Sequence, residues 1–126
     1  MAETYRVIVI EDDPSLAVLL ERLLLRRYPR MRVTTYWSGQ EALIAYEQQG
    51  ANLLLVDHGV PHLDGLSLTK RLREHGDSVP IIGISGDPSI RHQYLAAGAT
   101  AFVSGQDVFA QILALIGPLV PADWNG

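Results

Sequence analysis

The sequence predicts an open α/β fold in which one parallel β-sheet carries helices on both faces. Short aliphatic runs that suit buried strands alternate five times with segments whose apolar residues recur at helical spacing. Such alternation implies right-handed crossovers and a parallel sheet. A barrel of eight strand–helix units needs roughly twice this length. We therefore expect a single doubly wound, three-layer domain over residues 1–126.

The first strand–helix unit is clearly marked. The β-branched run at 6–10 favours a buried strand. A helix is expected to begin at Asp13 and Pro14, because Pro fits the first turn and Asp accepts hydrogen bonds from its free amides. Apolar residues at three- and four-residue spacing give this helix one buried face, and Pro29 ends it. That face is expected to comprise Leu16, Leu19, Leu20, Leu23 and Leu24.

Four further units follow. Strands are expected at 31–36, 53–56, 79–84 and 100–103, and helices at 38–50, 66–73, 88–97 and 106–116. Gly98 is typical of a residue that terminates a helix. The last helix is expected to turn Val108, Ile112, Leu115 and Ile116 inward. The tail at 117–126 fits either an ordinary chain end or the remnant of a linker.

Asp57 is the first candidate functional residue. It directly follows the unbroken apolar run at 53–56, which suits a strand buried on both faces, and a Gly and a Pro follow within four positions. Ligands of open α/β sheets bind at the carboxyl ends of the strands. An Asp in this place can also simply end a strand and cap a turn.

Composition indicates a folded globular domain and excludes several classes of site. Hydrophobic residues make up 48% of the chain and charged residues 19%. A net charge of −4 gives no general reason to bind nucleic acid or an acidic membrane. The absence of cysteine excludes disulfides, thiolate zinc sites and a cysteine nucleophile. With no signal-peptide pattern and no apolar run near the ~20 residues of a membrane span, a cytoplasmic location is expected.

Polar groups follow three of the predicted strands and are expected to meet at one edge of the sheet. Glu11, Asp12 and Asp13 follow the first strand, Asp57 the third and Ser85 the fourth. Carboxylates crowded into one cleft raise one another's pKa unless a cation is present. Mg²⁺ suits an open acidic cleft and commonly supports phosphoryl transfer. The acidic triplet alone could merely favour a helix start, but its combination with Asp57 and Ser85 favours a site.

The chain resembles the receiver domain of two-component response regulators. The resemblance covers 7–116 and rests on four ordered stretches: Val-Ile-Glu11-Asp12-Asp13-Pro, Leu-Val-Asp57-His-Gly-Val-Pro61-His-Leu-Asp64-Gly65, Pro80-Ile-Ile-Gly-Ile-Ser85-Gly86 and Ala97-Gly98-Ala99. The second is specific, since the family's acceptor Asp is followed four residues later by Pro and then by Asp-Gly. The resemblance implies a flavodoxin-like (βα)5 sheet with strand order 2-1-3-4-5.

The resemblance also implies site roles. Asp57 would be the phosphoacceptor and would share Mg²⁺ or Mn²⁺ with Asp12 as a direct ligand, Glu11 through water and the backbone carbonyl of Gly59. Ser85 matches the switch hydroxyl that moves to the phosphoryl group. Phe102 matches the switch aromatic, which rotates inward when that hydroxyl moves.

The implied protein is a switch that catalyses only its own phosphorylation and dephosphorylation. The partners implied are a sensor histidine kinase or phosphotransfer protein and a downstream effector or output domain. A homodimer would form through the face of the fourth helix, fifth strand and fifth helix. Neither nucleic acid nor membrane is expected to bind this domain directly.

One position departs from the family. The family has a Lys, usually followed by Pro across a cis peptide, where this chain has Gly105 and Gln106, and no Lys or Arg follows Arg91. The phosphoryl group would lose a charge-assisted partner worth ~1.5–3 kcal/mol. Without Pro we expect a trans, more flexible loop at Gly105.

Three other functions remain as alternatives. A pseudo-receiver would be a phosphorylation-independent interaction module, which the missing Lys favours and the intact acidic residues oppose. A haloacid-dehalogenase-type hydrolase needs a second Asp where Gly59 stands. A dinucleotide-binding domain needs a Gly-rich turn after the first strand, where this chain has Glu11 and Asp12.

The histidines and the main basic cluster have simpler interpretations. His58 and His62 are separated by Gly59 and Pro61, which indicates surface loop residues in place of a helical metal pair. The basic side chains of the third predicted helix indicate a solvated face more than a nucleic-acid patch: Lys70, Arg71 and Arg73.

Overall fold

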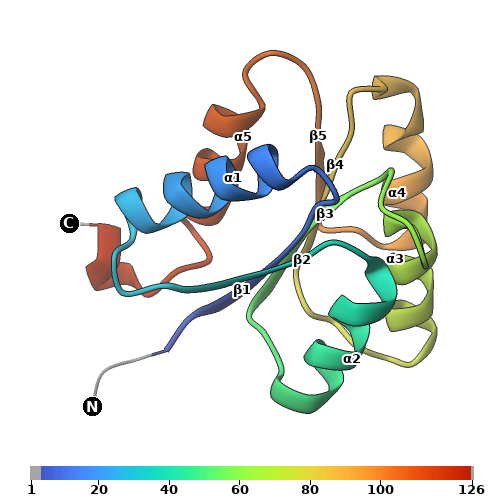
Figure 1. The fold of residues 1–126 in the computed structure, drawn as a ribbon, viewed down its shortest axis with the longest axis horizontal. Coiled ribbons are helices and arrows are strands. Elements are labelled where there is room, and N and C mark those ends of the chain that lie inside the picture. The colour runs from blue at the N-terminus through green and yellow to red at the C-terminus, as the bar shows by residue number, and fades with distance from the viewer. Residues whose placement is uncertain (1–3, 126) are drawn as a thin grey trace.

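A computed structural model describes residues 4–125, in which five parallel strands form one sheet between two layers of helices (Figure 1). The strands are β1 (Arg6–Ile10), β2 (Arg32–Tyr36), β3 (Leu53–Asp57), β4 (Ile81–Ile84) and β5 (Ala101–Val103). The helices are α1 (Pro14–Arg27), α2 (Gly39–Gln49), α3 (Gly65–Glu74), α4 (Arg91–Ala97) and α5 (Val108–Ile116), with short 3₁₀ turns η1 (Pro88–Ile90) and η2 (Ala122–Asn125).

The strand order is β2-β1-β3-β4-β5, as predicted. Successive residues of each strand face opposite layers, so the sheet separates two hydrophobic clusters. Val9 and Leu55 face α1 and α5, whereas Ile8 and Leu54 face α2 and α3. Figure 1 shows these two helix layers on opposite sides of the sheet. Both faces of the central strands are therefore covered, and only their ends reach solvent.

Helix starts follow the predicted capping chemistry. The Asp13 carboxylate accepts hydrogen bonds from the amides of Ser15 and Leu16 and begins α1. Ser38 begins α2 in the same way. One prediction for α1 is wrong, because Leu19 is 51% exposed. The buried face of α1 is narrower than the run of leucines suggested, and Ala17, Leu20 and Leu24 form it.

Some predicted boundaries shift by a few residues. β4 begins at Ile81 and not at Val79, because Pro80 has no N–H to donate to a neighbouring strand. The predicted helix at 88–97 is divided into η1 and α4. α5 begins at Val108, and Leu115, expected inside, is 36% exposed while Ile112 and Ile116 are fully buried.

The described part of the tail packs against the start of the sheet. Trp124 in η2 is 9% exposed, and its ring meets the ring of Tyr5 edge-on at a centroid distance of 6.3 Å. Asn125 accepts a hydrogen bond from the hydroxyl of Tyr28 and donates one to the carbonyl of Gly117. The tail therefore closes the end of the sheet opposite the carboxyl ends of the strands.

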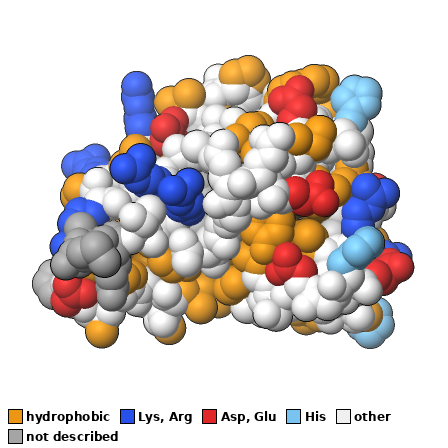
Figure 2. Space-filling view, turned by 90° about the horizontal axis from the view of Figure 1, so that it is seen from below, with side chains coloured by type: hydrophobic (Ala, Val, Ile, Leu, Met, Phe, Trp, Pro, Cys, Tyr) orange, Lys and Arg blue, Asp and Glu red, His pale blue; other side chains and the backbone are white. Residues whose placement is uncertain are grey.

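Charges are unevenly distributed over one face of the domain. Figure 2 shows more of the Lys and Arg side chains at the end where the termini lie and more of the acidic and His side chains at the other end. Among residues 4–125, no helix is long and apolar enough to cross a membrane.

Candidate functional site

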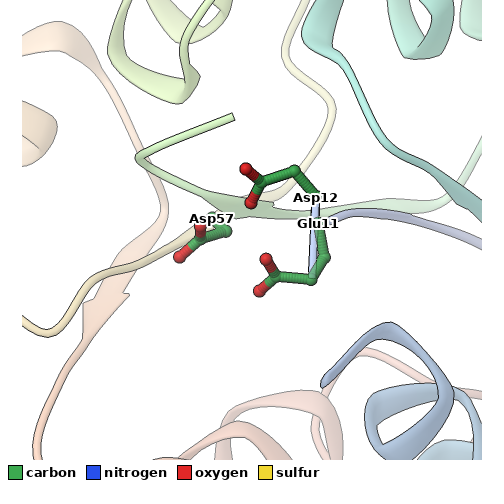
Figure 3. Close-up of side chains that lie close together, drawn as sticks. All are labelled: Glu11, Asp12 and Asp57. Carbon is green, nitrogen blue, oxygen red and sulfur yellow. The ribbon is translucent and has the colours of Figure 1, made fainter. Parts of the chain in front are cut away.

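Three carboxylates meet at the carboxyl ends of β1 and β3. Glu11 and Asp12 follow β1, and Asp57 is the last residue of β3. One oxygen from each lies within 4.8 Å of the other two, and Figure 3 shows the three side chains directed into the same space. Register explains this meeting, because β1 and β3 pair in parallel with Ile10 opposite Val56. The predicted carboxylate cluster is therefore present.

Glu11 is the buried member of the cluster, with 4% of its surface exposed. Its Oε2 accepts a hydrogen bond from the amide of Asp13, whereas its Oε1 is buried with no hydrogen-bond partner among the described residues. The pKa of Glu11 is raised to about 7, chiefly by burial and also by the carboxylates of Asp57 and Asp12, while the hydrogen bond from the Asp13 amide opposes the rise. A buried, unsatisfied carboxylate oxygen beside two other carboxylates is an arrangement that a bound cation would stabilise.

Asp57 is half-buried at the floor of the cluster. Burial and the nearby Asp12 carboxylate raise its pKa, and the backbone amide of Gly59 opposes this rise. Gly59 is exposed and immediately beside the Asp57 carboxylate, since a Cβ built on it would lie 3.8 Å from Asp57 Oδ2.

Ser85 stands at the end of β4, next to the end of β3. Its Oγ accepts a hydrogen bond from the amide of Asp87 at 3.0 Å, which leaves the hydroxyl hydrogen available to another acceptor. Asp57 and Ser85 line a common hollow of about 280 Å³ together with Gly105 and apolar side chains of α1 and α5. None of the residues that line it is a Lys or Arg.

The hollow is lined by Gly105, the position at which the resemblance to receiver domains implies a lysine. Gly105 adopts a left-handed conformation with φ +96°, and the peptide bonds of residues 4–125 are all trans. The expected trans loop is confirmed for this segment. Among residues 4–125, no Lys or Arg therefore lines the hollow on this side of Asp57.

Phe102 lies inside the protein, with 3% of its surface exposed. Its ring packs against Tyr94 at a centroid distance of 5.3 Å, and its carbonyl accepts a hydrogen bond from the Arg91 guanidinium. The predicted switch aromatic therefore already has the inward position in this structure.

Tyr94 is a contact residue that the sequence predictions missed. It is fully buried, and its hydroxyl lies 2.9 Å from Nδ1 of His58, the residue after Asp57. A Cβ on Gly83 would come within 2.7 Å of the Tyr94 ring. An isolated glycine in a strand marks such a close approach, so Gly83 was the available signal. His58 is thus half-buried and bonded, which corrects its prediction as a surface residue, whereas His62 is exposed as predicted.

The loop between β3 and α3 is fastened to the start of α2. The carbonyls of Pro61 and His62 accept hydrogen bonds from the amides of Gly39 and Gln40. His62 and Leu63 both have positive φ, 50° and 85°, which is unfavourable for residues with a side chain. The His62 ring also meets the exposed ring of Trp37 edge-on. This loop, which follows Asp57, is therefore held in a strained form.

The prediction that the basic side chains of α3 form a solvated face is wrong for Arg73. The Arg73 guanidinium donates hydrogen bonds to the carbonyls of Gly98, Asp77 and Val79 at 2.8–2.9 Å. It therefore ties α3 to the loops before β4 and after α4. Lys70 and Arg71 are exposed, as expected.

Comparison with known proteins decides the family. The model of the response regulator receiver domain matches residues 7–116. The chain belongs to the response-regulator receiver family. The curated relatives of this receiver domain include Response regulator RppA of Synechocystis sp., 30% identical over 90% of this chain and 50% of that protein. Transcriptional regulatory protein PrrA of Mycobacterium tuberculosis is 32% identical over 91% of this chain and 49% of that protein.

Solved structures agree with this assignment. A candidate response regulator from Chloroflexus aurantiacus superposes with a TM-score of 0.83 and 25% identity over 93% of this chain and 98% of that one. The receiver domain of sensor histidine kinase PA1611 from Pseudomonas aeruginosa was solved with magnesium coordinated in its active-site cleft. It superposes with a TM-score of 0.79 and 26% identity over 93% of this chain and 98% of that one. The receiver domain spans about half the length of the curated relatives it matches. It is therefore a module of two-component signalling with the flavodoxin-like fold.

Proposed function

We propose that this receiver domain is a Mg²⁺-dependent phosphoacceptor in which Asp57 takes a phosphoryl group from a sensor histidine kinase or phosphotransfer protein. The observation that carries the proposal is the meeting of Glu11, Asp12 and Asp57 within 4.8 Å, with one buried Glu11 oxygen unsatisfied. Hard oxygen donors of this kind suit Mg²⁺ or Mn²⁺. The magnesium in the cleft of the 26% identical PA1611 receiver supports the same choice.

Each residue has a distinct part in the proposal. Asp12, Asp57 and the backbone carbonyl of Gly59 would hold the ion directly, and Glu11 would hold it through water. When bound, such an ion neutralises charge on a transferring phosphoryl group. Neutralising the cluster also lowers the pKa of Asp57, so its carboxylate stays ionised and nucleophilic.

The transfer is a simple displacement. One oxygen of Asp57 forms an O–P bond while the P–N bond of the phosphohistidine donor breaks, and the released imidazole takes a proton from solvent. Water later cleaves the acyl phosphate to inorganic phosphate and the free carboxylate. The Ser85 hydroxyl, whose hydrogen is uncommitted, donates to a phosphoryl oxygen. The domain thus acts on its own aspartate as a switch and turns over no metabolite.

The partners of the proposed switch follow from its family. The kinase or phosphotransfer protein would present its histidine at the Asp57 edge of the sheet. The α4–β5–α5 face would contact an effector or output domain, or a second copy of the chain. A net charge of −4 argues against direct nucleic-acid binding by this domain.

A second candidate function is a pseudo-receiver that binds partners independently of phosphorylation. The observation that favours it is the hollow beside Asp57, which no Lys or Arg lines. It differs from the main proposal in one property, the ability of Asp57 to accept a phosphoryl group.

One experiment separates the two functions. The protein is incubated with Mg²⁺ and acetyl phosphate, and intact mass is compared with that of Asp57→Asn and of Asp87→Asn, an exposed acidic control outside the cluster. We expect one phosphoryl group on the wild type and on Asp87→Asn, none on Asp57→Asn, and none when EDTA replaces Mg²⁺. A wild type that gains no mass would contradict the phosphoacceptor proposal and favour the pseudo-receiver.

A further inference from the structure

Helix α4 is short and places a single buried side chain inside the domain. It has seven residues, no side-chain cap at its start, and one buried side chain, that of Tyr94. Tyr94 and Phe102 lie outside both hydrophobic clusters of the sheet. Leu95, the next residue of α4, is 47% exposed. Tyr94 is therefore the side chain through which α4 packs into the interior of the domain.

Tyr94 reaches from α4 to the segment that follows the acceptor. Its hydroxyl lies 2.9 Å from Nδ1 of His58, and the two rings meet at 75° with centroids 5.6 Å apart. The backbone amide of His58 donates to the carbonyl of Ile84 at 2.9 Å, so its main chain is held at β4. One covalent bond separates His58 from Asp57. The acceptor is thus joined to α4 through a single side-chain hydrogen bond.

The space for this bond is created by two glycines. A Cβ on Gly65 would come within 2.3 Å of the Tyr94 hydroxyl, and one on Gly83 within 2.7 Å of its ring. Only glycine, which has no Cβ, at both positions allows the Tyr94 ring to pass between β4 and the start of α3. The arrangement is therefore built into three separate elements.

The hydrogen bond between Tyr94 and His58 is maintained in either protonation state of the His58 ring nitrogen. Burial raises the pKa of Tyr94, so the hydroxyl keeps its proton. A tyrosine hydroxyl can both donate and accept, so it pairs with the His58 ring nitrogen in either protonation state of that nitrogen. Buried hydroxyls without a partner are costly, so His58 and Tyr94 move together more readily than they separate.

Phe102 cannot act independently of this pair. The inward space that its ring occupies is bounded by the Tyr94 ring, 5.3 Å away between centroids. A movement that begins at Ser85 and displaces Phe102 therefore also reaches Tyr94.

We infer that Tyr94 is a positioning residue that couples the segment after Asp57 to helix α4 through its hydrogen bond with His58. The inference rests on the proposed function, because it concerns how the phosphorylated state of Asp57 reaches the exposed face of α4. It assigns that transmission to His58 and Tyr94 in addition to Ser85 and Phe102.

The test compares Tyr94→Phe with Tyr46→Phe. The control also loses one tyrosine hydroxyl hydrogen bond, from Tyr46 to Asp77 at 2.7 Å, but at the far side of α3. In the protein without ligand, we expect amide hydrogen exchange in 91–99 to rise roughly three- to tenfold in Tyr94→Phe, as loss of one buried hydrogen bond allows. Tyr46→Phe should leave the exchange of this segment unchanged. Equal exchange in both variants would overturn the coupling.

A second measurement follows how a change at Asp57 is transmitted to α4. Mg²⁺ and beryllofluoride are added, and backbone NMR shifts are recorded near Asp57 and in α4. In Tyr94→Phe we expect the shifts near Asp57 to persist and those of α4 to fall to less than about half of the wild-type response, as loss of one buried hydrogen bond allows. Tyr46→Phe should respond like the wild type. An undiminished α4 response in Tyr94→Phe would show that the signal takes another route.

A double-mutant cycle separates coupling from general loss of stability. His58→Leu removes the other partner of the bond, so the α4 response of the double variant should equal that of the weaker single variant. Responses that decrease additively would contradict a shared bond. If the wild type shows no shift anywhere on addition of beryllofluoride, the phosphoacceptor proposal fails, and the exchange comparison still decides whether His58 and Tyr94 are coupled.

Discussion

At the scale of single residues, Glu11 makes the acidic cluster sensitive to pH when no metal is bound. Its pKa in the folded protein is about 7, above the ordinary value of 4.5. The folded state therefore binds this proton more tightly than the unfolded state does. The stabilisation is complete below the ordinary pKa and is lost as pH rises through 7.

We therefore expect Mg²⁺-free protein to be less stable at about pH 8 than at about pH 5, by on the order of 2 kcal/mol from this group. Urea unfolding at both pH values measures the difference. Glu11→Gln removes the titrating group, so its stability should depend less on pH. Addition of Mg²⁺ should stabilise the wild type mainly at the higher pH. The same pH dependence in Glu11→Gln would show that other groups cause it.

Gly105 tests whether the missing cation weakens the site. Gly105→Lys should strengthen the binding of beryllofluoride in the presence of Mg²⁺ by roughly tenfold or more, because a charge-assisted hydrogen bond is worth about 1.5–3 kcal/mol. The control is Gly105→Ala, since both variants bear the cost of a side chain at φ +96°, about 1–2 kcal/mol. Titration of both variants gives the comparison. Equal affinities would mean that the loop keeps the ammonium away from Asp57.

The site residues differ in how far the sequence could predict them. Glu11, Asp12 and Asp57 follow short apolar runs directly, and parallel strands bring such positions together, so their meeting could be predicted. Tyr94 could not be found in this way. A single buried aromatic in a seven-residue helix produces no apolar period, and its partner His58 resembles an ordinary loop residue. Protonation at Glu11 also depends on burial, which the sequence does not reveal.

At the scale of elements, the close approach of β4 and α4 depends on Gly83. Gly83→Ala should destabilise the protein by about 1–3 kcal/mol, the usual cost of overpacking, because the added methyl would lie 2.7 Å from the Tyr94 ring. Gly86, three residues later, serves as the control, because a Cβ built on it would meet nothing within 4 Å. Urea unfolding of Gly86→Ala should differ little from that of the wild type. Equal destabilisation would mean that the ring moves aside freely.

Element boundaries were predicted less well than element types. Capping residues fixed the starts of α1 and α2, because Asp13 and Ser38 accept hydrogen bonds from the free amides that follow. Leucine spacing overestimated the buried face of α1, since a helix against a sheet buries only part of a wide apolar stripe and leaves Leu19 outside. The division between η1 and α4 has no signature in the residue pattern.

At the scale of the whole molecule, the tail closes the end of the sheet remote from Asp57. Trp124→Ala should destabilise the protein by about 3–5 kcal/mol, because it removes a buried aromatic that packs on Tyr5. Asp123→Ala removes only an exposed ion pair with Arg30 and should have almost no effect. Urea unfolding of the two variants measures the contrast. Similar stability in both would show that the tail contributes little.

The order of the sheet was predictable in full, because five alternating units leave few topologies once the receiver motifs are aligned. The docking of the tail was not. Its residues include two prolines and no apolar period, and its attachment comes from contacts with Tyr5 and Tyr28, far away in sequence.

The positions of the two tryptophans have an optical consequence. Trp37 follows β2 at the acidic end of the sheet and is 49% exposed, whereas Trp124 is buried at the opposite end. The Trp37 indole is therefore exposed to solvent and should emit at longer wavelength than the Trp124 indole, which lies in an apolar environment. Ligand arrival at the carboxylates would perturb the red-shifted component, and detachment of the tail would perturb the blue-shifted one. Without an added label, the protein thus reports changes at the two ends of its sheet at two different emission wavelengths.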